Sequence, residues 1–236
     1  MTNTILQVEH IEKRYSEQTV LDDIVFDLQE GEILGVIGPN GAGKTTLLEC
    51  LTGLIPANGG LVKWLGQPLS RALRKQAMFY IPDNIEPYAE HTVMEVLKFF
   101  TSIYRKFTTV TQTAINAFKL EPVIHKNVGT LSKGYRKRLL LALSLIVPHQ
   151  VIVMDEPFDG LDPRQTRDVM ILLRDEVNKG RTLLLSIHQL SDAERICDRF
   201  ILLGLGTVCG KGTMNELREQ SGLSSGTLED IFYAVT

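Results

Sequence analysis

The sequence predicts an α/β fold, a parallel sheet flanked by helices and interrupted by an inserted helical segment. Strand-like segments fill residues 1–37, and strand-like and helix-like segments alternate after Pro148. Between about Asn84 and Val147 only helical periodicity is present. Alternation of strand and helix is typical of a parallel sheet, because each parallel connection needs a crossover.

The N-terminal strands are indicated by β-branched and apolar residues. Ile5, Leu6, Val8 and Ile11 indicate the first strand, Val20 to Leu28 the second, and Glu32 to Ile37 the third, which follows a Glu30-Gly31 turn. The next segments are a helix from Gly43 to Leu51 that ends at Gly53, a strand from Leu61 to Leu65 and a strand from Ala77 to Ile81.

One helix in the inserted segment is predicted in detail. Apolar residues at helical spacing, Val93, Val96, Leu97, Phe100 and Tyr104, line one face. Thr92 with Glu95 three residues later has the form of a capping box at its start. After Pro148 the alternating segments are Val151 to Met154, Arg164 to Val177, Thr182 to Ile187, Leu190 to Ile196 and Arg199 to Leu203.

Composition narrows the class of protein. The chain has 236 residues with 44% hydrophobic and 22% charged residues, which suits a folded domain with a sizeable core. Its 25 Lys and Arg against 28 Asp and Glu give a net charge of -3. Binding that is driven by phosphate neutralisation usually needs a basic protein, so we expect no nucleic-acid partner.

Cysteine usage and the N-terminus favour a cytoplasmic protein. Cys50, Cys197 and Cys209 are odd in number and lack C-x-x-C spacing, which favours reduced thiols over a disulfide framework or a zinc site. The first four residues show no signal peptide. The longest apolar run, Leu139 to Val147, is about half of the ~20 residues that a membrane span needs.

A phosphate-binding loop is the strongest motif. Gly38-Pro39-Asn40-Gly41-Ala42-Gly43-Lys44-Thr45 fits G-x-x-x-x-G-K-[ST] and lies between a hydrophobic strand and a helix. Backbone N–H groups of such a loop surround a β-phosphate, Lys44 reaches the β and γ oxygens, and Thr45 supplies a Mg²⁺ ligand. The sequence therefore predicts binding of a nucleoside triphosphate with Mg²⁺.

Two carboxylates follow a second buried strand. Val151 to Met154 is apolar and is followed by Asp155 and Glu156, at the edge where parallel sheets present ligands. Alone, the pair is as typical of an acidic turn. With the loop at Lys44, it predicts that Asp155 holds the Mg²⁺ shell and that Glu156 orients the attacking water.

With these residues the chain resembles the ATP-binding cassette (ABC) ATPase family along nearly its whole length. Leu131-Ser132-Lys133-Gly134-Tyr135 takes the place of that family's L-S-G-G-Q signature, with Ser132 lying 88 residues after Lys44. The family uses this segment to contact ATP that is bound by the other subunit. A serine and a glycine amide at a helix start form an anion site, although the segment alone is more typical of an ordinary helix cap.

Further matches follow in the family's order. The resemblance implies that Tyr15 stacks on adenine, that Thr46 joins the nucleotide-binding set, that Asp162 in Gly160-Leu161-Asp162-Pro163 belongs to the D-loop, and that His188 is the switch histidine. Taken alone, Tyr15 is more often a packing residue. The segment around Asp162 is also typical of a turn with Pro at the first helical position.

One position departs from the family. The Q-loop glutamine aligns with Asp83 in Ile81-Pro82-Asp83-Asn84. An ionised carboxylate cannot donate a hydrogen bond as an amide does, but it can enter a Mg²⁺ shell. We therefore list Asp83 with Thr45 and Asp155 as an expected metal ligand.

The resemblance implies a P-loop NTPase (RecA-like) core with an N-terminal antiparallel β-subdomain and an inserted helical subdomain. The implied boundaries are 1–83 for the β-subdomain and the P-loop half of the core, 84–147 for the helical subdomain with the signature, 148–210 for the second half of the core, and 211–236 for a C-terminal helical tail.

The function that the resemblance implies is ATP hydrolysis that powers a separate membrane permease, with the chain peripheral to the inner face of the cell membrane. One P-loop and one signature per chain imply a homodimer with two composite ATP sites. Leu228-Glu229-Asp230-Ile231-Phe232 and Leu131-Ser132-Lys133-Gly134 look most like ABC-2-type exporters. The alternatives are a non-transport ABC ATPase and a nucleotide-dependent regulatory module.

The permease contact is expected in residues 84–147. This segment carries the Q-loop side of the insertion and more apolar residues than a small subdomain buries. The candidates are Tyr88, Phe99, Phe100 and Tyr104, each of which is equally compatible with a place in the core.

Overall fold

The computed structural model of the protein describes residues 3–83, 85, 88–104 and 108–235. Asn84, with which the expected helical subdomain begins, lies outside the described residues, as do Met1 and Thr2 of the N-terminus and Thr236 at the end of the expected tail. Among the described residues, none of the helices has the length and the apolar character that crossing a bilayer requires.

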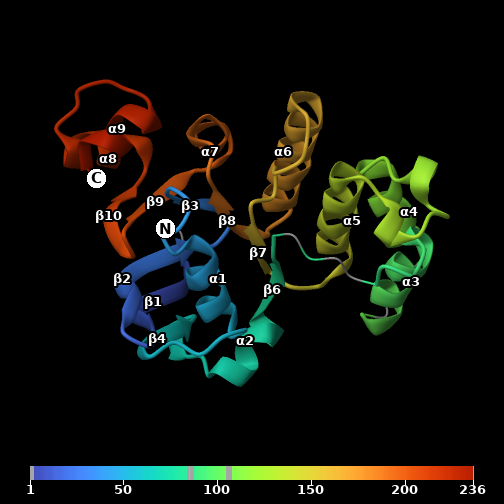
Figure 1. The fold of residues 1–236 in the computed structure, drawn as a ribbon, viewed down its shortest axis with the longest axis horizontal. Helices are drawn as coiled ribbons and strands as arrows, with labels where there is room; N and C mark the ends of the chain where they lie inside the picture. The colour runs from blue at the N-terminus through green and yellow to red at the C-terminus, as the bar shows by residue number, and fades with distance from the viewer. Residues whose placement is uncertain (1–2, 84, 86–87, 105–107, 236) are drawn as a thin grey trace.

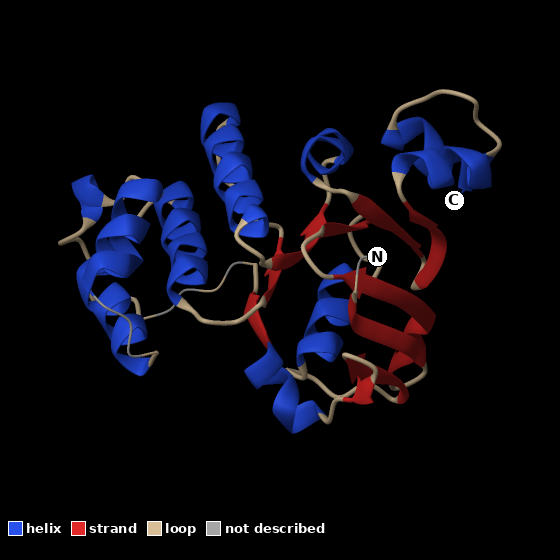
Figure 2. Ribbon diagram, turned by 180° about the vertical axis from the view of Figure 1, so that it is seen from behind, coloured by secondary structure: helices blue, strands red, loops and turns tan. Residues whose placement is uncertain are grey.

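The strands form two sheets (Figure 1 and Figure 2). A four-stranded antiparallel sheet has the order β2-β1-β4-β5, and a six-stranded sheet has the order β10-β9-β3-β8-β7-β6. In the second sheet the strands from β9 to β6 are parallel and β10 pairs with β9 in the antiparallel direction. The strands are β1 Thr4–Tyr15, β2 Gln18–Gln29, β3 Ile33–Ile37, β4 Gly59–Trp64, β5 Gln67–Pro68, β6 Met78–Ile81, β7 Val151–Asp155, β8 Thr182–Ile187, β9 Arg199–Gly204 and β10 Thr207–Gly212.

The helices lie around the six-stranded sheet, and α3, α4 and α5 gather to one side of β6 (Figure 1). The antiparallel sheet and α1 lie on the other side of β6. The helices are α1 Lys44–Thr52, α2 Arg71–Ala77, α3 Val93–Ile103, α4 Thr108–Ala117, α5 Lys133–Ile146, α6 Pro163–Asn178, α7 Leu190–Ile196, α8 Met214–Ser221 and α9 Leu228–Val235, with short 3₁₀ turns at Glu121–Val123 and Val128–Thr130.

The parallel sheet is buried on both faces, so its strands show continuous apolar runs. In β3, Ile33 and Ile37 belong to the core under the helical segment, whereas Leu34 and Val36 face the core shared with α1 and the antiparallel sheet. The same alternation divides the buried residues of β7 and β8 between the two cores. Burial on both faces is the usual condition of parallel strands.

The predicted α/β class with an antiparallel N-terminal sheet and an inserted helical segment is confirmed. The strand Thr182–Ile187 and the helix Leu190–Ile196 have the predicted bounds. The helix from Val93 begins with the predicted capping box, in which Thr92 and Glu95 each accept the other's backbone N–H.

The elements that were not predicted include the short strand β5 at Gln67–Pro68, the helix α2 and the strand β10. The helix α2 at Arg71–Ala77 falls between two predicted strands, and β10 at Thr207–Gly212 crosses the boundary at residue 211 where the helical tail was expected to begin. The helices of the tail are therefore α8 and α9 only, within the described residues.

Candidate nucleotide-binding site

The loop Gly38–Gly43 joins β3 to α1 and bends back over β2. Gly43 precedes the helix with φ of 102°, and a Cβ atom there would lie 2.9 Å from the Leu21 Cδ2 atom and 3.0 Å from the Val20 carbonyl oxygen. Only glycine combines this backbone conformation with such close packing. The loop therefore presents its backbone at the N-terminus of α1, as the motif predicts.

Lys44 is held at the centre of this loop. Its side chain is 7% exposed, and the ammonium donates to the carbonyl oxygens of Gly38 at 2.8 Å and Pro39 at 3.3 Å. The same Nζ atom lies 3.5 Å from Glu156 Oε1. A lysine buried in this way places a positive charge in the loop and close to the carboxylate at the end of β7.

Thr45 and Asp155 come from separate elements and meet at the metal side of the site. The Thr45 hydroxyl donates to Asp155 Oδ2 at 2.7 Å, and the Ser186 hydroxyl donates to Asp155 Oδ1. Asp155 is only 2% exposed. A hydroxyl and a carboxylate are hard oxygen ligands and fit Mg²⁺, which takes its remaining ligands from phosphate oxygens and water.

No all-protein metal cage accompanies this pair: within the described ranges, no group of three or more His, Cys, Asp or Glu side chains could hold a metal ion. That arrangement agrees with Mg²⁺ chemistry at triphosphate sites, where one or two protein ligands are usual.

Glu156 is fixed by its backbone and its side chain. Its φ is 48°, in the left-handed region, and its N–H donates to the Ser186 carbonyl oxygen at 3.2 Å and the Ser186 hydroxyl at 3.0 Å. Glu156 Oε2 lies 2.5 Å from His188 Nδ1 and accepts the His188 backbone N–H at 3.2 Å. The predicted acidic and histidine residues are therefore in direct contact.

A cleft of about 350 Å³ joins these groups. Gly41, which has φ of 83°, has open space on the side where a Cβ atom would stand. The lining residues are Val20, Asn40, Gly41, Gly43, Lys44, Thr45, Thr46, Asp83, Asp155 and Glu156. Most of the predicted loop residues and all three expected metal ligands thus border one cleft, while Ala42 is buried beneath the loop.

The cleft carries an excess of negative charge on its metal side, and this shows in neighbouring groups. Burial raises the pKa of Glu49, and the charge of Asp155 raises it further. Burial also raises the pKa of Tyr80, with additional contributions from Asp155, Glu49 and Asp83. A cation between these carboxylates would reduce their mutual repulsion.

Asp83 lies in the cleft, but its partner is a residue that sequence reasoning missed. Lys137 Nζ donates to Asp83 Oδ1 at 2.9 Å and to the carbonyl oxygen of Glu156 at 2.9 Å. Ser186 was missed as well, although a hydroxyl in the interior of the apolar strand β8 was a usable signal. Lys137 gave no such signal, because its partners lie 54 and 19 residues away.

Tyr15 is not among the described residues that line the cleft, which include Val20. It ends β1 opposite Gln18, is 48% exposed, and its ring lies under the Lys13 ammonium at 4.7 Å from the centroid. Stacking on adenine therefore remains a prediction for this residue.

The signature lies apart from the cleft within this chain. Ser132 caps the N-terminus of α5 and its hydroxyl accepts the Tyr135 N–H at 3.4 Å, and Lys133 Nζ donates to Asp159 Oδ2 at 2.7 Å. None of the described residues that line the cleft comes from residues 131–135. Leu131 is buried, whereas Ser132 is exposed.

The D-loop aspartate begins the next helix. Asp162 Oδ1 accepts the Gln165 N–H at 2.8 Å in a capping box, and Pro163 occupies the first helical position. A Cβ atom on Gly134 would lie 3.2 Å from the Gly160 carbonyl oxygen, so the signature helix packs on the D-loop of its own chain.

The fold and the cleft together define a P-loop ATPase, and comparison with known proteins identifies the family. The model of the family described as ABC transporter matches residues 21–159. The chain belongs to the ABC transporter family, as an ATP-hydrolysing subunit.

Relatives and solved structures agree with this assignment. The chain is 32% identical over 222 residues to the uncharacterized ABC transporter ATP-binding protein YthP of Bacillus subtilis (strain 168), covering 92% of this chain and 90% of the relative. It is 33% identical to the Nod factor export ATP-binding protein I of Rhizobium etli, covering 93% and 72%. A solved ATP-binding subunit of an ABC transporter superposes with a TM-score of 0.90 at 30% identity, covering 98% and 99%.

Proposed function

We propose that two copies of this chain close on two molecules of ATP with Mg²⁺, hydrolyse them, and thereby drive a separate membrane permease. The observation that carries the proposal is the set of contacts at the cleft. Lys44 and His188 each contact the Glu156 carboxylate, and the Thr45–Asp155 pair lies beside them. Lys44 and the loop amides would bind the phosphates, and Thr45 and Asp155 would hold Mg²⁺.

Hydrolysis needs a water molecule that is aimed at the γ-phosphorus. Glu156 is placed to orient that water and to accept its proton as the new P–O bond forms and the bond to the β–γ bridging oxygen breaks. His188 Nδ1 contacts Glu156 Oε2, and this contact would turn the carboxylate toward the γ-phosphate. When bound, Mg²⁺ supplies charge neutralisation of the phosphate oxygens.

The homodimer is supported by the separation of the signature from the cleft. Ser132 offers a hydroxyl at an exposed helix N-terminus, where backbone N–H groups attract an anion. Since this helix end does not border the cleft of its own chain, we propose that it contacts ATP bound by a second copy. Asp162, exposed at the start of α6, would lie between the two copies.

The test is the Glu156→Gln variant. It should bind ATP, hydrolyse it about a hundredfold or more slowly, and accumulate as a dimer with ATP, because hydrolysis is the event that opens the dimer. Light scattering with and without ATP measures the mass. A variant that stays monomeric with saturating ATP at high protein concentration, both alone and with its permease, would contradict the dimer.

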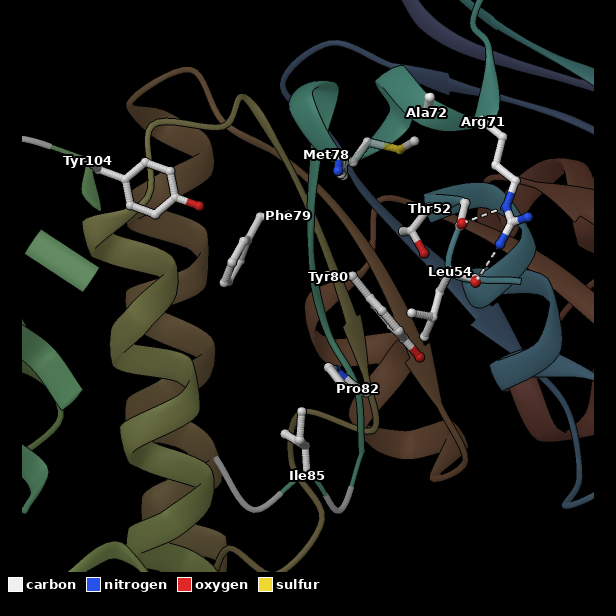
Figure 3. A pocket seen from close by; sticks show the side chains of 12 residues that line it. Thr52, Leu54, Arg71, Ala72, Met78, Phe79, Tyr80, Pro82, Ile85 and Tyr104 are labelled. Atoms are coloured by element: carbon white, nitrogen blue, oxygen red, sulfur yellow. Dashed lines mark hydrogen bonds between the residues drawn. The ribbon is translucent and has the colours of Figure 1, made fainter. Parts of the chain in front are cut away.

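The permease is proposed to dock in a groove between α2, β6 and the end of α3 (Figure 3). The groove measures about 910 Å³, is larger than the nucleotide cleft and is lined mainly by apolar side chains. Phe79 and Tyr80 leave β6 toward opposite sides of it, Phe79 toward Tyr104 and Tyr80 toward Leu54 (Figure 3). Lys75 adds a positive charge, which favours a permease segment with an acidic residue.

The four candidate contact residues named from the sequence differ in their exposure and in whether they line the groove. Tyr104 lines the groove, whereas Tyr88 and Phe99 are not among its described lining residues but are exposed, with ring centroids 5.5 Å apart. Phe100 is half-buried and packs edge-on against Phe79. Tyr104 and the Tyr88–Phe99 pair are therefore the better candidates for a partner contact.

Site-specific photo-crosslinking to a co-expressed permease tests this docking. A photoreactive residue at Leu54, which is 58% exposed in the groove, should crosslink. The matched control is Leu205, which is 98% exposed in the turn between β9 and β10. Crosslinks confined to residues 199–236 would contradict the proposed groove.

Direction and location rest on relatives. The names of the Nod factor export proteins support an exporter, and the ABC-2 type is the subtype that the signature and the C-terminal residues favour. We propose that the chain acts at the cytoplasmic face of the membrane through its permease. A regulatory module is less well supported, because the hydrolytic pair Glu156 and His188 is assembled. A non-transport ATPase is less well supported, because the relatives are named as ATP-binding proteins of transporters and export systems.

A further inference from the structure

Lys137 is a buried cation at the junction of three elements. It lies in the second turn of α5, its side chain is 4% exposed, and its ammonium is 2.9 Å from Asp83 Oδ1, just after β6, and 2.9 Å from the Glu156 carbonyl oxygen, just after β7. Lysine is seldom buried unless its charge is paired and hydrogen-bonded. Both conditions are met here by groups that border the nucleotide cleft.

The bond to the Glu156 carbonyl acts on a strained residue. Glu156 has φ of 48°, which costs free energy in a residue other than glycine and persists only when neighbours hold it. Ser186 holds the N–H side of this residue, and Lys137 holds the carbonyl side. The direction of the Glu156 carboxylate toward His188 and Lys44 depends on that backbone conformation.

The bond to Asp83 acts on charge. The carboxylates of Asp83, Asp155 and Glu156 line the cleft that would also receive the phosphates. A positive charge on Lys137 compensates one of them. Without it, the negative charge of Asp83 would be compensated less and would repel the γ-phosphate more strongly.

We propose that Lys137 is a positioning residue for ATP hydrolysis, holding the Glu156 backbone in its productive conformation and compensating Asp83 beside the phosphates. This proposal rests on the function proposed for Glu156. It assigns Lys137 two separable effects, one on the rate of hydrolysis through Glu156 and one on ATP affinity through Asp83. It also links the signature helix α5 to both strand ends of the cleft.

The experiment compares Lys137→Met, Lys137→Arg and the double variant Asp83→Asn/Lys137→Met with the wild type, using ATP as the probe. For Lys137→Met we expect kcat to fall about tenfold or more with the KM for Mg·ATP within about threefold, the scale of a misplaced catalytic group. Affinity for ATP without Mg²⁺, measured with a fluorescent ATP analogue, should also fall, by about fivefold. Lys137→Arg should keep kcat within about threefold of wild type, because it retains charge and donors.

The double variant separates the two effects. Asp83→Asn/Lys137→Met should recover metal-free ATP affinity, because the negative charge at residue 83 is gone, but it should not recover kcat, because the Glu156 carbonyl still lacks its donor. The matched control is Arg74→Met, which removes a buried cation of α2 whose guanidinium donates to the Cys50 carbonyl oxygen and which is not among the described residues that line the cleft. Its kcat should be unchanged.

A kcat of Lys137→Met within twofold of wild type would overturn the proposal, and so would full recovery of kcat in the double variant. Should Lys137→Met fail to fold, the double variant, which removes the charges of Lys137 and Asp83 together, carries the kcat test. Glu156→Gln in the same assay keeps the two hypotheses apart. If that variant hydrolyses ATP at the wild-type rate, the role of Glu156 fails, whatever Lys137 does.

Discussion

The molecule has two helix N-termini that suit phosphate, and they are built in opposite ways. At α1 the polar contacts of the cleft are made within one chain. Lys44 and Asp155 are buried, and every charged group of the cleft contacts another element of the same chain. At α5 the signature is exposed, and its polar contacts are the Ser132 cap and the Lys133–Asp159 pair.

From this difference we infer which step, ATP binding or its hydrolysis, a single chain can support. The cleft has its phosphate loop, metal ligands and carboxylate in mutual contact, so one copy should suffice for binding. The signature offers donors toward the outside, so its contribution should appear only when a second copy approaches.

Lys44→Ala should remove ATP binding almost completely. A charge-assisted hydrogen bond to phosphate contributes about 2–3 kcal/mol, and loss of it weakens binding about a hundredfold. Titration with a fluorescent ATP analogue measures the affinity. The exposed Lys179→Ala is the matched control and should bind normally. Unchanged affinity of Lys44→Ala would show that the cleft is not the nucleotide site.

Ser132→Ala should separate binding from hydrolysis. Affinity of the isolated chain for ATP should stay at the wild-type value, while hydrolysis falls by about tenfold or more through loss of a phosphate contact in the dimer. Thr213→Ala is the matched control, because Thr213 caps α8 in the same way but lies far along the chain from the signature. Each variant should lose about 1 kcal/mol of stability from its cap, and only Ser132→Ala should lose activity.

Mixing two inactive variants sharpens this comparison. A mixed dimer of Ser132→Ala with Glu156→Gln has one composite site in which both residues are intact. Random pairing should therefore restore about a quarter of the wild-type activity, since half of the dimers are mixed and each has one working site of two. Activity that stays at the level of the separate variants would mean that Ser132 acts within its own chain.

The parts of the fold that sequence predicts well are those whose signal is local. Thr182–Ile187 is an apolar run between turns, and Thr92 with Glu95 marks a helix start, so both were found with correct positions. The helix α2 has only seven residues, and the side chain of its N-cap residue Ser70 makes no capping hydrogen bond. The sequence therefore contains little that indicates this helix. The strand β10 contains two glycines and owes its place to pairing with β9.

The site divides in the same way. The loop with Lys44 and Thr45 is contiguous in sequence, and its spacing alone predicts the cleft. Lys137 contacts the Asp83 carboxylate and Ser186 contacts the Asp155 carboxylate, and only the fold brings these residues together. A prediction from sequence could assign Asp83 to a metal but could not reveal that a buried lysine already lies against it.

The smallest expected effect concerns Lys133, where the family usually has glycine. Its ammonium pairs with Asp159, but the two side chains are 55% and 34% exposed, so water weakens the interaction. The hydrogen bond from Lys133 lowers the pKa of Asp159, and the pair stabilises the folded state while Asp159 is ionised. We expect a coupling of about 0.5 kcal/mol at neutral pH.

A double-mutant cycle with Lys133→Met and Asp159→Asn measures this coupling by denaturant unfolding. Methionine is the suitable replacement, because the Lys133 methylenes pack over Gly160, where a Cβ atom would lie 2.8 Å from the lysine Cγ and Cδ atoms. A group whose pKa is lowered on folding stabilises above its unfolded pKa, about 3.9 for aspartate, and loses that contribution as pH falls through the folded value. The coupling should therefore be constant from neutral pH down to about pH 5 and vanish in stronger acid. A coupling above about 2 kcal/mol would show that the signature is locked to its own D-loop, and the contrast with the cleft would then have to be withdrawn.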